Sequence, residues 1–209
     1  MVRRLCNGLI LSLLFVGCTS MAYANSPRLL TFQGLKNLQQ VGTYDGVDFS
    51  SNFYGLISVL KGGAGNFTRT PTGTPAIFIS GPTGSTVTGT MNVGGGFTGI
   101  QFFYTAAFQE TVKIWSGTNG SGTLLATLNL SPNNGMCGSP AYCNWTSAGI
   151  NFSGTAASVT FTGGANGLGL TDITLNSSKT AIPEPSSIYL LGIGLLGTGF
   201  GRFRRLLSL

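Results

Sequence analysis

Short apolar alternations, separated by turns rich in glycine and asparagine, run through the middle of the chain. In residues 124–130 apolar side chains occupy every even position, and the same period of two recurs at 87–93, 100–104 and 158–162. Successive side chains of a strand point to opposite faces, so such an alternation predicts half-buried strands. No stretch of this region keeps a helical period over three turns. The sequence therefore predicts an all-β fold.

The predicted β domain covers residues 25–181. Asn119–Gly122 is typical of a hairpin loop and stands between the apolar runs 112–115 and 124–130. About ten short strands at this spacing favour a β-sandwich or jelly roll. A domain of this length buries an adequate core without a metal.

The first 24 residues have the parts of a secretory signal peptide. An arginine pair at 3–4 precedes the apolar run 9–16, and Ala22 and Ala24 supply the small residues before a cleavage site. Two alternatives stay open. One is an uncleaved membrane anchor, although the apolar run is shorter than the roughly 20 residues that span a bilayer. The other is a lipoprotein signal, because residues 15–18 resemble a lipobox that would leave Cys18 as the N-terminus.

Cleavage after Ala24 leaves two cysteines in the exported chain, Cys137 and Cys143. An even pair in an exported protein predicts a disulfide, here closing a small ring. A metal site is disfavoured because the chain has no histidine and no further cysteine remains after cleavage.

The last 28 residues have three parts in order. The first is a proline-rich tripeptide: Pro183, Glu184 and Pro185. Residues 186–201 are uncharged and mostly apolar, and as a helix of about 24 Å they predict a short transmembrane segment with snorkelling flanks. The third part is a basic cluster, which marks the cytoplasmic side: Arg202, Arg204 and Arg205.

Together these parts resemble the PEP-CTERM sorting domain of Gram-negative bacteria that make exopolysaccharide. The resemblance covers residues 182–209. It implies that an exosortase-type enzyme recognises and processes the tail, that the membrane is a transient anchor, and that the protein reaches the envelope, the surface or the medium. The same tail occurs in some ice-binding proteins.

Several predicted strands also resemble the β-sandwich ectodomains that often carry this tail. The segments 30–35, 41–49, 157–163 and 170–175 carry that likeness. Many such domains have an acidic residue after the first phenylalanine, where this chain has Gln33. The resemblance therefore implies the fold but lends little support to an inherited cation site.

The predicted domain offers few groups for catalysis. The absence of histidine excludes a Ser-His-Asp triad, a Cys-His pair and any histidine-ligated metal. A glycan hydrolase needs two carboxyl groups at a set separation. Asp45 and Glu110 are the candidate pair, but no motif places them together. We expect no enzymatic activity and keep hydrolysis as a remote alternative.

Basic residues gather at the two ends of the chain, which carries a net charge of +6. Between residues 25 and 182, six lysines and arginines face four acidic residues, a net charge of +2. Nucleic-acid binding needs a clustered basic patch, so we expect no nucleic-acid partner.

Exposed aromatic rings are candidate platforms for the faces of sugars. Tyr142 and Trp145 flank the predicted disulfide ring, which would hold them as a glycan contact. Tyr54 is a further candidate, whereas Tyr104 and Trp115 are expected in the core.

Two other binding functions stay open as alternatives. Asp45, Asp48 and Asp172 are candidate Ca²⁺ ligands in turns, as in a Ca²⁺-dependent carbohydrate-binding module. Alternating threonines at 68–74 suit an ice-binding array, although Pro71 interrupts them. We expect an exported, non-enzymatic protein of the envelope or matrix, which binds exopolysaccharide or serves structurally.

Overall fold

The computed structural model describes residues 26–135 and 137–176, which form ten strands and one short 3-10 turn. The elements are β1 (Arg28–Leu30), β2 (Thr43–Tyr44), β3 (Val47–Phe49), β4 (Phe53–Leu56), η1 (Val59–Lys61), β5 (Ala76–Ile79), β6 (Thr86–Ala106), β7 (Glu110–Trp115), β8 (Leu124–Leu130), β9 (Thr146–Gly164) and β10 (Leu168–Leu175). Every pairing between these strands is antiparallel, so the predicted all-β class is confirmed.

The predicted signal peptide and sorting segment lie outside the described residues, and so do the two helices expected to flank the domain. That part of the predictions includes Ala22, Ala24, Pro183, Glu184, Pro185, Arg202, Arg204 and Arg205. Within 26–135 and 137–176, no helix has the length and apolarity needed to span a bilayer.

Two long strands run through both layers of the fold. The first half of β6 pairs with β3 and with the second half of β9, and its second half pairs with β10 and the first half of β9. The register breaks between Asn92 and Phe97, where Gly95 and Gly96 have φ near 79° and 75°. Glycine adopts such angles at little cost. The separate short strands predicted at 87–93 and 100–104 are therefore one bent strand.

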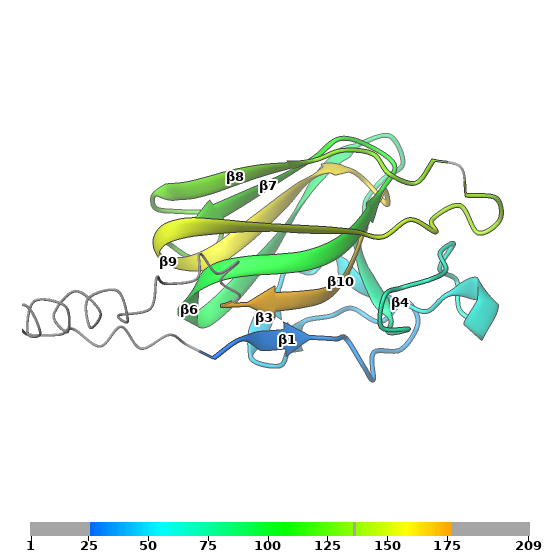
Figure 1. Cartoon of the computed structure of the whole chain (residues 1–209), viewed down its shortest axis with the longest axis horizontal. Coiled ribbons are helices and arrows are strands. Elements are labelled where there is room, and N and C mark those ends of the chain that lie inside the picture. The colour runs from blue at the N-terminus through cyan, green and yellow to red at the C-terminus, as the bar shows by residue number, and fades with distance from the viewer. Residues whose placement is uncertain (1–25, 136, 177–209) are drawn as a thin grey trace, which may run out of the picture.

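This bend doubles one continuous sheet into a sandwich, which Figure 1 shows from the side. We call the two parts the β10 layer and the β7 layer. The β10 layer has the order β4-β5-β10-β6-β9, with β1 beside β10. The β7 layer has the order β2-β3-β6-β9-β7-β8.

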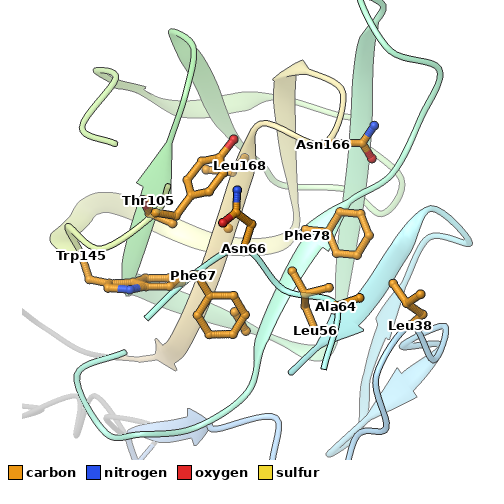
Figure 2. Close-up of a pocket in the computed structure, with 13 residues that line it drawn as sticks. Leu38, Leu56, Ala64, Asn66, Phe67, Phe78, Thr105, Trp145, Asn166 and Leu168 are labelled. Carbon is orange, nitrogen blue, oxygen red and sulfur yellow. The ribbon is translucent and has the colours of Figure 1, made fainter. Parts of the chain in front are cut away.

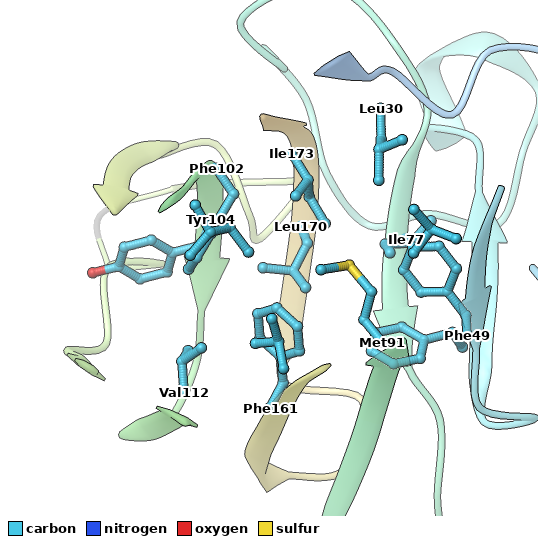
Figure 3. Packing of buried hydrophobic residues seen from close by; sticks show 14 of the residues in the cluster. Leu30, Phe49, Ile77, Met91, Phe102, Tyr104, Val112, Phe161, Leu170 and Ile173 are labelled. Atoms are coloured by element: carbon cyan, nitrogen blue, oxygen red, sulfur yellow. The ribbon is translucent and has the colours of Figure 1, made fainter. Parts of the chain in front are cut away.

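The core fills the space between the two layers (Figure 3). Phe102 on the β10 layer meets Phe161 on the β7 layer edge to face, with ring centroids 5.8 Å apart. Tyr104 is buried, as predicted. Trp115 is instead half-buried on the outer face of β7, where its indole N–H donates to the Thr160 hydroxyl at 3.0 Å. Its place follows from strand alternation, because Ile114 takes the inward position.

Candidate functional site

A pocket of about 250 Å³ lies on the outer face of the β10 layer. Phe78 of β5 is half-buried between the fully buried Ile77 and Ile79, so it points away from the core and toward this pocket. Leu56 of β4 and Gly169 of β10 line the same space. The segment 64–67 and the loop that ends at Trp145 provide the remaining wall. Together with Thr105 of β6, these strand residues place four neighbouring strands in its floor.

A disulfide-closed loop covers one side of the pocket. Cys137 and Cys143 are joined, as the sequence predicts. Inside this ring the backbone N–H of Tyr142 donates to the Asn66 carbonyl at 3.1 Å, and the N–H of Thr68 donates to the Tyr142 carbonyl at 2.9 Å. The ring therefore docks on a segment that is distant in sequence. This contact brings Tyr142 to the pocket wall.

Trp145 and Phe67 form the aromatic side of the pocket (Figure 2). Their rings meet edge to face, with centroids 5.7 Å apart and an interplanar angle of 81°. The indole N–H of Trp145 donates to the Thr68 carbonyl at 2.8 Å, which fixes the ring plane. Gly169 keeps the neighbouring space open, since a Cβ there would stand 3.4 Å from the Trp145 ring.

Polar groups in the pocket are neutral. None of its lining residues is Asp, Glu, Lys or Arg. Burial, and secondarily the negative charge of Glu110, raise the pKa of Tyr142 above its usual range, so the phenol stays protonated at neutral pH. Thr105 is buried, and its hydroxyl has no hydrogen-bond partner among the described residues. This oxygen is enclosed, and the Thr105 atom that lies beside Gly169 is the methyl carbon Cγ2.

The structure does not assemble the proposed Ca²⁺ ligands. Asp172 is buried on β10, where its carboxylate accepts from the Thr72 hydroxyl at 2.8 Å. Asp48 accepts from Thr43 at 2.6 Å, and Asp45 occupies the β2–β3 turn. Within the described residues, no group of three or more Asp, Glu, Cys or His is placed to hold a metal. Turn and loop-anchoring roles account for these side chains.

Three further candidates from the sequence do not form a site in the structure. The threonines of 68–74 lie in an irregular loop, where Thr72 and Thr74 turn their hydroxyls toward Asp172 and form no flat array. Glu110 is buried at the start of β7, on a different element from the exposed Asp45. Tyr54 is the cross-strand neighbour of Phe78, with ring centroids 6.1 Å apart, and does not line the pocket.

Phe67, Phe78 and Thr105 are pocket residues that the sequence analysis did not single out. Phe78 carries a usable signal, because it is an aromatic residue at an outward position of a strand. The sequence around Phe67 contains no such signal, because its position in the pocket wall depends on the backbone bridge to the distant Tyr142.

The fold and pocket thus define an all-β domain with a neutral, aromatic-lined site. The family model of the PEP-CTERM protein-sorting motif matches residues 181–205, which confirms the resemblance of the tail. The chain therefore carries a sorting signal that indicates export. No curated protein matches the chain.

Among solved structures, the chain is similar to carbohydrate-binding modules. One mutant of a family 29 module is 11% identical with a TM-score of 0.44, covering 77% of this chain and 98% of the module. A second family 29 mutant is 10% identical with a TM-score of 0.45, covering 78% and 94%. A family 6 module is 18% identical with a TM-score of 0.39, covering 74% and 95%. At these values nothing about a ligand follows for the present chain.

Proposed function

We propose that this is an exported, non-enzymatic protein that binds a neutral sugar unit of an envelope or matrix polysaccharide in the pocket beside Trp145. The carrying observation is a pocket with aromatic walls, neutral polar groups and no charged side chain. The sorting motif supports export, with an exosortase-type enzyme as processing partner and the membrane as a transient anchor.

A sugar ring matches this lining in two ways. Its C–H face packs on an aromatic surface, and Trp145 and Phe67 offer such a surface at a fixed angle. Its hydroxyls need neutral donors and acceptors, which Tyr142 and the amide of Asn66 supply. A few polar groups in a mainly apolar pocket are the usual composition of a small-ligand site.

Retention on immobilised exopolysaccharide from the producing bacterium tests the proposal. The full chain should be purified in a zwitterionic detergent that carries no sugar headgroup. Trp145→Ala and Tyr142→Ala are expected to weaken retention about tenfold, whereas Trp115→Ala, on the other layer, is the matched aromatic control. Unchanged retention of both pocket variants would refute the site.

Thr105→Val is an isosteric control within the pocket lining. The substitution keeps the shape of the side chain and removes an enclosed, unpartnered hydroxyl, so the variant should melt no lower than the parent. Its retention should equal that of the parent, because the enclosed oxygen does not reach the ligand. A panel of glycan hydrolase assays on the parent chain should release no reducing ends.

A further inference from the structure

A second groove, of about 590 Å³, adjoins the pocket at Phe67, which lines both. Its main wall is the loop of residues 57–75 between β4 and β5, and Gln33 contributes from the segment after β1. A polymer seated in the pocket therefore has a neighbouring surface within reach along the same loop.

This loop is held in place by its own hydrogen bonds. The N–H of Val59 donates to the Gly65 carbonyl and the N–H of Gly65 to the Ile57 carbonyl, both at 2.8 Å. The ammonium group of Lys61 donates to the Gly73 carbonyl at 2.8 Å, which ties the two ends of the groove wall together. The groove is thus part of the folded structure.

The charge along the groove is positive. Among the described residues, five are Lys or Arg, and two of these five, Lys61 and Arg69, line this groove, while none of its lining residues is acidic. Gln33 keeps the opposite side uncharged. The carboxylate of Asp172, which is 5% exposed, does not line the groove and accepts a hydrogen bond from the lining residue Thr74.

Both cations keep donors for a ligand. Lys61 has three N–H donors, of which the Gly73 carbonyl takes one. Arg69 is exposed, and its backbone has a φ of 59°, an uncommon angle for a residue other than glycine. Guanidinium and ammonium groups bind carboxylate, sulfate and phosphate oxygens through charge-assisted hydrogen bonds.

We propose that this groove binds the negatively charged groups of the polysaccharide whose neutral unit occupies the pocket, which makes the ligand an acidic polysaccharide. This inference rests on the proposed function, because it names the class of polymer that the pocket would hold.

Chemically modified polymers test it directly. The full chain is assayed against exopolysaccharide from the producing bacterium, and against the same polymer after carboxyl reduction, desulfation or dephosphorylation. We expect one of these treatments to weaken binding about threefold or more, and so to identify the anionic group. Binding of the untreated polymer should also weaken as ionic strength rises, because the cations are exposed to screening.

Variants without the two positive charges then test whether the groove binds the acidic groups. Lys61→Gln combined with Arg69→Gln should reduce binding of the untreated polymer to the level of the modified one, while Lys113→Gln on β7 serves as the charge-matched control. Trp145→Ala should reduce binding of both polymers. Equal, salt-insensitive binding of all polymers, or a binding polymer with no acidic group, would overturn the inference and leave the pocket standing. Failure of the full chain to bind any form would overturn both.

Discussion

The carboxyl group of Glu110 occupies the space directly over Gly163. A Cβ at Gly163 would stand 1.3 Å from Oε2 of Glu110, a distance that no pair of nonbonded atoms can adopt. The side chain of Glu110 is buried, and one of its oxygens has no hydrogen-bond partner among the described residues. The glycine on β9 therefore makes room for an acidic group that the fold encloses at the start of β7.

Gly163→Ala is expected to destabilise the domain by about 2–3 kcal/mol, because the new methyl group must displace a buried side chain in a packed region. Chemical unfolding of the variant and the parent measures the difference. Gly94→Ala is the control, since a Cβ at Gly94 meets nothing within 4 Å. Equal stability of the Gly163 variant and the parent would contradict the packing.

Glu110 should also give the stability a characteristic pH dependence. Burial raises its pKa from 4.5 to about 7, although a backbone hydrogen bond from Gly164 lowers it in part. Between these two pH values the folded chain holds a proton that the unfolded chain has released. The free energy of unfolding should therefore fall as the pH rises from 4.5 to 7, with a slope of at most about 1.4 kcal/mol per pH unit from this group.

Glu110→Gln is expected to remove that contribution and to make the domain more stable than the parent at pH 8. Unfolding curves recorded across the pH range measure both effects. Gly94→Ala, which changes no titratable group, should leave the slope as it is in the parent. An unchanged or steeper slope in the Glu110 variant would count against a proton held by this side chain.

Local patterns in the sequence were sufficient to predict the all-β class and the disulfide. Alternation placed Phe102 and Phe161 on inward positions, because the period of two is a property of each strand by itself. It did not show that residues 87–93 and 100–104 belong to one strand. Glycines at 94–96 resemble a turn in the sequence, whereas in the structure they bend β6 without ending it.

The sequence indicated only some of the pocket residues, because local patterns do not show contacts between distant segments. Tyr142 and Trp145 stood out because they flank two cysteines in a short segment. Their partner Phe67 lies 75 residues before Tyr142, and the backbone bridge between them leaves no local pattern. The unpartnered hydroxyl of Thr105 is likewise visible only once the surrounding strands are packed.

Removal of the disulfide should affect binding more than folding. Cys137→Ser combined with Cys143→Ser opens a ring with five intervening residues, so the loss of stability should be about 2 kcal/mol at most. Tyr142 lies within that ring and Trp145 follows it, so polysaccharide retention should fall several-fold. Reduction of the parent with a thiol should reproduce the loss. If the double serine variant and the thiol-treated parent both retain the polysaccharide fully, the ring does not position Tyr142 and Trp145.

Gly169→Ala should reduce binding by narrowing the pocket. A methyl group at this position would stand 3.0 Å from Cγ2 of Thr105 and 3.4 Å from the Trp145 ring, so it would enter the space assigned to the sugar. Retention should fall about tenfold, while the free energy of unfolding should change by about 1 kcal/mol or less. Gly138→Ala is the matched control, because its Cβ would meet nothing within 4 Å. If the Gly169 variant binds as tightly as this control, the sugar does not reach the floor of the pocket.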